Sequence, residues 1–344
     1  MDRDTLCHGQ MTGAIIAGSG IVHPVTVTRH SVAVVNKPAL SDVHFEGGAT
    51  EKNLRADLIS EVRSLLSERV PSPDSVEIVI TANFLQSVRG HLPPDLSQVY
   101  DTVRGTGTVA AKTIQSPSGH VVIVMNDWLF SPNVDDANAQ ARLTRHTAVH
   151  ESGHAAILQR GELSEIFRSD RIGLSRAHRI FTGHAELVID EYRCELLATS
   201  SGPPYPGDQA EHLDLAHLHD ALHHAVALQY PGESMDRPYN EVRQAANVHW
   251  KELAYLAANL NGGNPPSSLT RQTLWKQYVG AEVYSGLTLA LSGVLDAATA
   301  MSDETLDDAA LKVSSALEAS LQQLGFAILD QPDDGLYFDV LRKD

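Results

Sequence analysis

Short runs of alternating apolar and polar residues, and one longer stretch with helical spacing, make up the first part of the chain. Residues 25–27 and 31–35 are such runs and predict strands, because strand side chains alternate between two faces. Residues 76–80 are mostly β-branched and predict a further strand. Residues 51–69 place apolar side chains on one helical face and end before Pro71, which predicts an amphipathic helix.

Two more strand-like runs follow, separated by a turn sequence. Residues 108–115 and 120–126 flank Ser116-Pro117-Ser118-Gly119, and together these segments predict a hairpin. Residues 121–125 suit either an edge strand that pairs with an extended peptide or an interior strand, and the sequence favours neither.

Helical spacing dominates the chain beyond this hairpin. Residues 200–207 interrupt it with Ser, Pro and Gly, which are typical of a loop. The pattern after this break predicts helices at 208–229, 240–260, 270–301 (broken near Gly286 or Gly293) and 305–324, and a terminal strand at 337–340. We therefore expect a mainly helical C-terminal part.

Composition excludes some classes of function. The net charge of −17 argues against a nucleic-acid partner, because binding phosphate requires a basic face. Residues 13–18 form a short apolar stretch interrupted by Gly and preceded by acidic residues, so neither a signal peptide nor a membrane segment is expected. Two cysteines, Cys7 and Cys194, make no disulfide framework. We expect a cytoplasmic protein without a membrane partner.

The sequence His150-Glu151-Ser152-Gly153-His154 carries the strongest chemical signal. It lies in a segment of helical spacing, and a helix places His150 and His154 one turn apart on one face. Two neutral imidazoles at this spacing bind Zn²⁺, and Glu151 beside them serves as the general base for water. The alternative is a surface helix with two solvated histidines. Gly153 costs about 1 kcal/mol of helix propensity relative to Ala, which close packing or the metal would explain.

A catalytic zinc needs a third protein ligand, and the next predicted helix offers several. Residues 185–198 form an apolar face that also carries Glu191 and Glu195. A buried carboxylate is costly unless it is paired or binds a metal, so we predict that Glu191 is the third ligand. The alternative ligands are Glu186, Asp190, Glu195 and His184.

These two segments together resemble the gluzincin-type zinc metallopeptidases of the ImmA/IrrE class. In that class HExxH is followed by a helix that reads roughly ExxANxFA, whose first Glu binds zinc. Residues 191–198 of this chain read Glu-Tyr-Arg-Cys-Glu-Leu-Leu-Ala. Residues 121–126, a β-branched run that ends in Asn ahead of the metal helix, add to the resemblance, which covers about residues 120–200.

The sequence differs from the pattern of the class at Cys194, Glu195 and Leu197. The number of residues between the HExxH motif and Glu191 is also larger than usual for the class. What the resemblance implies is a Zn²⁺ peptidase with Glu191 as the third ligand. It also implies limited cleavage of a regulatory protein.

The order of the predicted elements indicates an α+β fold. We expect a zincin-like metallopeptidase core, in which a mixed sheet lies over the HExxH helix, followed by a mainly helical C-terminal part. The predicted domains are an N-terminal α/β region at 1–115, a zincin core with the metal site at 116–200 and a helical C-terminal domain at 205–344.

The predicted helix after the loop at 200–207 is rich in histidine, with His212, His217, His219, His223 and His224. Because it follows the ligand helix after a short connection, we predict that His219 or His223 reaches the metal cleft and donates to the oxyanion that forms when water attacks a carbonyl. Packing between helices, or solvation, is an equal alternative. Other candidate donors are Tyr192, Tyr205 and an arginine-rich segment with Arg160, Arg168, Arg171, Arg176 and Arg179.

These features favour a zinc-dependent hydrolase, specifically a peptidase that cleaves a peptide or regulatory protein with metal-activated water. Two other hypotheses stay open. One is a catalytically silent zincin-fold module for sensing or interaction, and the other is a zinc enzyme that modifies a small peptide-derived metabolite. Nothing in the sequence indicates the oligomeric state.

Overall fold

The computed structural model describes residues 43–100, 103–104, 107–116, 118–162, 175–202, 215–229, 236–263, 282–330 and 336–341. All of them belong to one compact unit of the chain, residues 37–344. The strands predicted at 25–27 and 31–35 lie outside the described residues.

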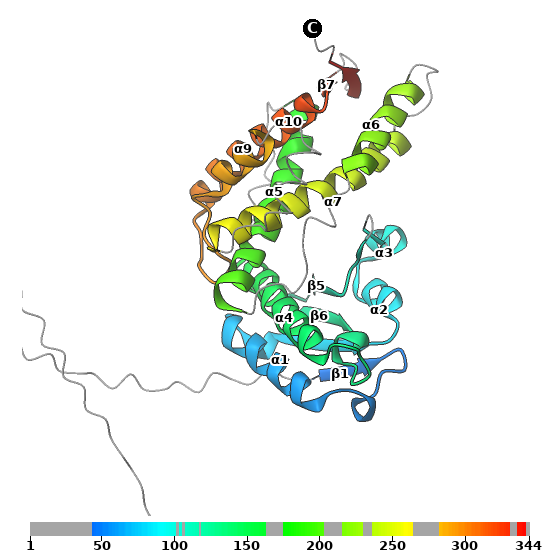
Figure 1. Ribbon diagram of the computed structural model, residues 1–344, viewed down its shortest axis with the longest axis vertical. Helices are drawn as coiled ribbons and strands as arrows, with labels where there is room; N and C mark the ends of the chain where they lie inside the picture. Colours follow the sequence, from blue (N-terminus) through cyan, green and yellow to red (C-terminus); the bar gives the residue numbers. More distant parts are fainter. Residues whose placement is uncertain are drawn as a thin grey trace, which may run out of the picture. The chain divides into compact units, whose positions relative to one another are not determined.

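A four-stranded mixed sheet forms the first half of this unit, with the strand order β1-β2-β6-β5. β1 (Val43–Glu46), β2 (Val76–Thr81) and β6 (Val121–Asn126) run parallel, and β5 (Ala111–Gln115) pairs antiparallel with β6 (Figure 1). The hairpin predicted from the turn sequence is confirmed, since the Ser116 N–H donates to the His120 carbonyl at 2.8 Å. β6 pairs on both sides, so residues 121–125 are an interior strand and β5 is the edge.

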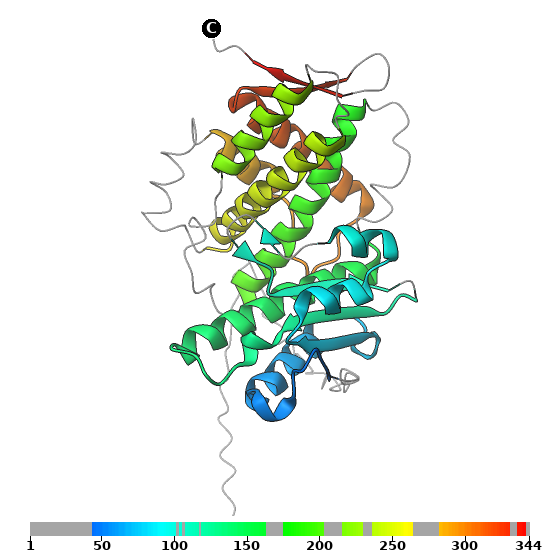
Figure 2. The same ribbon diagram turned by 90° about the vertical axis from the view of Figure 1, so that its right-hand side faces the viewer.

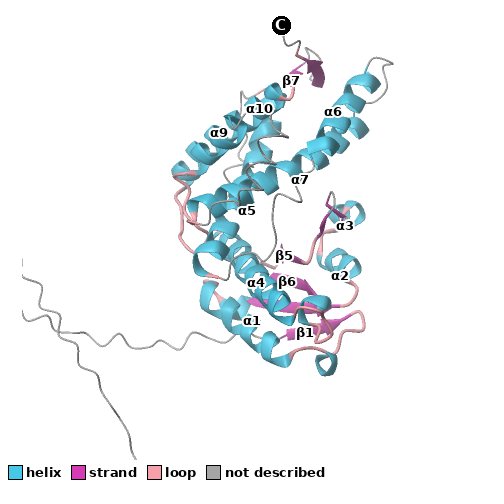
Figure 3. Ribbon diagram, viewed as in Figure 1, coloured by secondary structure: helices cyan, strands magenta, loops and turns pink. Residues whose placement is uncertain are grey.

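Side chains of the central strands alternate between two cores, as the strand pattern predicts. Ile78 and Ile123 pack with α1 (Ala56–Arg69) and α4 (Ala137–Arg160) on one face. Val79 and Val124 pack with α2 (Phe84–His91) on the other. Figure 3 shows the strands between these helices.

The predicted 51–69 helix divides into two elements. Residues Glu51–Asn53 form the short 3-10 helix η1, and α1 begins only at Ala56 because the Arg55 N–H donates to the Phe130 carbonyl instead of continuing a helix. The remaining short elements are η2 (Pro73–Ser75), α3 (Pro94–Val99), β3 (Val103–Arg104), β4 (Gly107–Thr108) and η3 (Asp127–Phe130).

Helices dominate the second half, as predicted. They are α5 (Arg176–Ser201), α6 (Leu215–Gln229), α7 (Asp236–Asn261), α9 (Glu282–Leu291) and α10 (Asp303–Gln323), shown in Figure 2. α9 contains Gly286 and ends at Leu291, and residues 292–301 are turns and loop, so the helix predicted to run to 301 is wrong beyond Leu291. Residues 270–281 of that prediction lie outside the described residues. The predicted terminal strand is β8 (Leu336–Val340), and it pairs antiparallel with β7 (Phe326–Asp330), which the sequence pattern did not predict.

One hydrophobic core joins the helices across the predicted boundary at 200–205. It contains Val149 of α4 and Ile189 of α5 together with Leu253 of α7 and Leu306 of α10. α4 also contributes Ala148 to the sheet core, so this helix lies between the two cores. The described part of the chain is α+β, as predicted. Among the described residues, no helix has the length and apolar character needed to cross a membrane.

Candidate metal centre

The HExxH motif lies in the interior of α4, where a regular helix is secured at both ends. The Asp136 carboxylate accepts the N–H groups of Asn138 and Ala139 at 3.0 and 2.8 Å, which satisfies backbone donors of the first turn. Gly161 ends the helix in the left-handed conformation, with φ at 68°. The motif is therefore regular helix, and His150 and His154 lie one turn apart as predicted.

α5 crosses α4 closely, and Gly153 permits the approach. A Cβ atom added at Gly153 would lie 2.9 Å from Cys194 Sγ and 3.0 Å from Ala297 Cβ, which is closer than side chains tolerate. The glycine inside the motif therefore has a packing reason, and its cost in helix propensity is offset by the contact between the two helices.

Replacing Gly153 by Ala should lower the free energy of unfolding by about 1–3 kcal/mol, because the added methyl forces the helices apart. The higher helix propensity of Ala offsets part of this loss. Thermal or urea unfolding measures this. Gly183→Ala is the matched control, since Gly183 is also helical but a Cβ there meets nothing within 4 Å. Equal stabilities of the two variants would contradict the packing role of Gly153.

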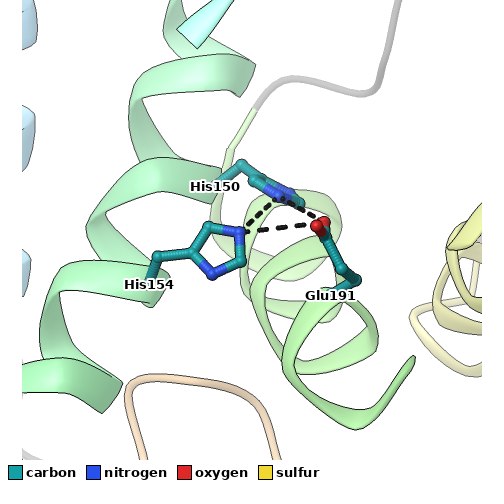
Figure 4. Close-up of side chains that lie close together, drawn as sticks. All are labelled: His150, His154 and Glu191. Carbon is teal, nitrogen blue, oxygen red and sulfur yellow. Dashed lines mark hydrogen bonds and ion pairs between the residues drawn. The ribbon is translucent and has the colours of Figure 1, made fainter. Parts of the chain in front are cut away.

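Three side chains converge between α4 and α5 (Figure 4). The Nε2 atoms of His150 and His154 are 3.2 Å apart, and Glu191 Oε2 lies 3.3 Å from the first and 3.7 Å from the second. A tetrahedral zinc ion bonded at about 2.0–2.1 Å holds its ligand atoms about 3.3–3.4 Å apart. The spacing of these two nitrogens and one oxygen thus fits a metal ion of this size, and the group is buried.

Carboxylates on α5 hold the other nitrogen of each histidine. His150 Nδ1 lies 3.2 Å from Glu195 Oε2, and His154 Nδ1 lies 2.9 Å from Asp190 Oδ2. With Nδ1–H donating to a carboxylate, Nε2 carries the lone pair that a metal needs, which is the usual arrangement around metal-binding histidines. The alternative ligands Asp190 and Glu195 therefore lie on the Nδ1 side of the imidazoles, away from the three atoms of the metal group.

Glu195 has further partners, which account for a carboxylate in the core. His146 Nε2 lies 3.1 Å from its Oε2, and Asn259 Nδ2 donates to its Oε1 at 3.3 Å. Burial by itself would raise the pKa of Glu195, but His146 and His150 outweigh it and hold the pKa well below its ordinary value. Glu195 is thus a buried anion on which the orientation of His150 depends.

Glu191 is also bound by two residues of α7. Lys251 Nζ donates to its Oε1 and the Tyr255 hydroxyl donates to its Oε2, both at 2.6 Å. Burial alone would raise the pKa of Glu191, but Lys251 and the two histidines lower it well below the ordinary value. The third carboxylate is therefore ionised, as a metal ligand must be, and its orientation is set by α7.

Glu151 points toward the sheet edge. Thr113 on β5 donates its hydroxyl to Glu151 Oε2 at 2.5 Å, and both side chains are buried. Because β5 is the edge strand, the candidate base lies beside a strand whose outer side has no partner strand among the described residues. An extended chain that paired with β5 would pass close to Glu151.

The histidines predicted to supply the oxyanion donor lie elsewhere in the helical part. His219 and His223 contact each other, with Nε2 atoms 3.2 Å apart, and both rings pack against Phe326 of β7. β7 is tied to the first turn of α5, where the Ala177 N–H donates to Asp330. Glu191 lies 14 residues (177 to 191) further along α5, a rise of about 21 Å. None of the contacts described for either histidine is with the metal group.

The other sequence candidates have structural partners or lie outside the described residues. His184 Nδ1 lies 2.5 Å from Asn247 Oδ1, and burial lowers the pKa of His184 to about 4. Arg160 is paired with Glu162, and the Tyr192 hydroxyl accepts from Asn261 at 2.8 Å. Glu186 lies on α5 outside the metal group. The placements of Tyr205, Arg168, Arg171 and His212, and the side chains of Arg176 and His217, are outside the described part of the chain.

Sequence reasoning missed five residues of this site: Thr113, His146, Lys251, Tyr255 and Asn259. Lys251 and Tyr255 are spaced four apart in a predicted helix, and with Asn259 they form a partly buried polar stripe at helical spacing. This stripe is the sequence signal from which the contact between α7 and the metal group could have been predicted.

Comparison of the chain with models of known protein families, with curated proteins and with solved structures found no match. The resemblance to the ImmA/IrrE class therefore stays a prediction. The interpretation of the site depends on its own geometry.

Proposed function

We propose that this protein is a zinc-dependent hydrolase, a peptidase that cleaves peptide bonds in a peptide or regulatory protein. The observation that carries the proposal is the group of His150, His154 and Glu191, whose three facing atoms are spaced for a tetrahedral ion. Glu151 follows His150 in the same helix and its carboxylate is held by Thr113, and in this proposal it serves as the general base. A zinc ion held there would polarise a substrate carbonyl and lower the pKa of a water molecule.

In this proposal Glu151 takes the proton from the attacking water and passes it to the leaving amine. Thr113 donates to one oxygen of Glu151 at 2.5 Å, which holds the carboxylate in place and leaves the other oxygen for the proton. A carboxylate that is fixed by one hydrogen bond stays in one rotamer, so it can accept and return a proton without having to reorient.

Tyr255 is the candidate donor to the substrate oxyanion, in place of His219 or His223. Its hydroxyl lies 2.6 Å from Glu191 Oε2, and its ring lies edge-on to the His150 ring at 5.5 Å between centroids. The raised pKa of Tyr255, caused by burial and then by the nearby Glu191 and Glu252, keeps the phenol protonated at neutral pH. A protonated phenol beside the metal group can donate where negative charge develops.

Replacing Tyr255 by Phe should lower kcat by roughly 10²-fold with little change in KM or zinc content, because Lys251 still holds Glu191 and the lost donor acts mainly in the transition state. Steady-state kinetics and metal analysis of the purified variant measure both. Tyr192→Phe is the matched control, since it removes another buried phenol whose partner, Asn261, is not in the metal group. A Tyr255→Phe enzyme with normal kcat would exclude this role.

The proposed function is tested with purified protein, one equivalent of zinc and a peptide library, with cleavage products read by mass spectrometry. Hydrolysis should appear with zinc, disappear with a chelator and return when zinc is restored. Tight zinc binding without any peptide cleavage would instead favour a silent sensing module or an enzyme for a small metabolite. Absence of stoichiometric zinc binding would overturn the proposal altogether.

A further inference from the structure

His154 takes part in a second cluster of metal-binding side chains, on the opposite side of its ring from Glu191. One ligand atom each from His154, Asp190 and Cys194 lie within 4.8 Å of one another. Asp190 Oδ2 is 2.9 Å from His154 Nδ1, and Asp190 Oδ1 is 4.0 Å from Cys194 Sγ. Figure 4 shows one ring nitrogen of His154 facing Glu191 and the other pointing away from it.

The ligand types of this second cluster differ from those of the first. The first group offers two nitrogens and one carboxylate oxygen, whereas the second offers one nitrogen, one oxygen and the sulfur of a buried free cysteine. Sulfur ligands select soft cations, while nitrogen and oxygen ligands suit a wider range of ions. Asp190 and Cys194 are four residues apart on α5, so one helix face presents both to His154.

We propose that His154, Asp190 and Cys194 form a second cation site, selective for a thiophilic divalent ion, that competes with the zinc group for His154. Binding there releases one proton, from the Cys194 thiol, while the proton on His154 Nδ1 moves to Nε2 and the imidazole stays neutral. The bonds formed are from the cation to Sγ, to Nδ1 and to an Asp190 oxygen. No oxidant or reductant is required.

The competition follows from the single proton of a neutral imidazole. When Nε2 serves the first group, Nδ1 keeps its proton and donates to Asp190. When Nδ1 binds a cation, the Asp190 carboxylate is taken up by that cation and His154 loses the hydrogen bond that orients Nε2. Only the competition rests on the proposed zinc centre; the second site itself requires neither zinc nor hydrolysis.

Cadmium alone is the probe, because bonding to a thiolate gives Cd²⁺ a strong ultraviolet charge-transfer band. All measurements use full-length protein carrying Cys7→Ser, so that Cys194 is the one thiol present. We expect one equivalent of Cd²⁺ to produce the band in metal-free protein and in Glu191→Gln, which weakens the first group only. Cys194→Ser should abolish the band, and Asp190→Asn should weaken Cd²⁺ binding at least tenfold.

Zinc loaded beforehand should weaken Cd²⁺ binding to the second site at least tenfold in the parent protein and have little effect in Glu191→Gln. Circular dichroism of each variant establishes that it is folded. Absence of a thiolate band in the metal-free parent, or an unchanged affinity in Asp190→Asn, overturns the second site. A band that is insensitive to zinc overturns the competition. Neither result depends on whether peptides are cleaved, so failure of this inference and failure of the proposed function are distinguishable.

Discussion

Replacing Glu151 by Gln is expected to lower the turnover number for peptide hydrolysis by about two to four orders of magnitude while zinc remains bound. Gln has the size and helix propensity of Glu, and its side-chain oxygen can still accept from Thr113, which lies 2.5 Å from Glu151 Oε2. What it cannot do is accept a proton from water at neutral pH. Zinc analysis and kcat, measured on the same preparation, test this expectation.

Two further variants distinguish the loss of the general base from a nonspecific effect of substitution on the enzyme. Glu318→Gln makes the same change at an exposed position of α10 and should leave kcat unaltered. Thr113→Val removes the hydroxyl that positions Glu151, so it should reduce kcat by less than the loss of the base itself. Normal turnover in Glu151→Gln would exclude Glu151 as the general base even if the zinc site is correct.

Replacing Glu191 by Ala is expected to remove most of the bound zinc and to destabilise the metal-free protein as well. The metal loses its third ligand, and the Lys251 ammonium and Tyr255 hydroxyl lose the carboxylate that they bind at 2.6 Å. An unpaired polar group costs about 1–3 kcal/mol when buried, and the low end applies because 34% of the Lys251 side chain is exposed. Metal analysis and urea unfolding in chelator measure the two effects.

The double variant Glu191→Ala, Lys251→Met should recover much of the stability but none of the zinc, because it removes the unpaired charge without restoring a ligand. Asp190→Ala and Glu195→Ala should keep zinc with an affinity reduced about 10- to 100-fold, as expected for residues that orient the ligating histidines. If Glu191→Ala retained zinc and Glu195→Ala, Glu186→Ala or His184→Ala lost it, the assignment of the third ligand would be wrong.

Much of this site was predictable from local sequence. HExxH on a regular helix, with Glu191 on the following helix, came from periodicity and from the cost of a carboxylate in an apolar face. The structure brings His150, His154 and Glu191 together as that reasoning predicted. The predicted donor histidines on α6 pack instead against Phe326. A short connection allows the next helix to fold back over a site, but it does not determine whether that helix or a later one does so.

Local residue patterns predict the types of most elements, the two imidazoles one turn apart and a short set of side chains that includes the third ligand. The sequence favoured Glu191 among them, but the positions of Asp190 and Glu195 relative to the imidazoles depend on how the two helices pack. The way α5 crosses α4 directs Glu191 to the Nε2 side and Asp190 and Glu195 to the Nδ1 side. Helical periodicity gives the face on which a residue lies, but not the crossing of two helices, which depends on contacts such as Gly153 against Cys194.

The same limit explains the contributions of β5 and α7. Strand periodicity does not distinguish an edge from an interior strand, and the parallel pairing of β6 with β2 made β5 the edge next to Glu151. Lys251 and Tyr255 reach Glu191 from 60 and 64 residues along the chain. The polar stripe on α7 indicates that this helix faces a polar site, but which residues it contacts there depends on how whole helices pack against one another.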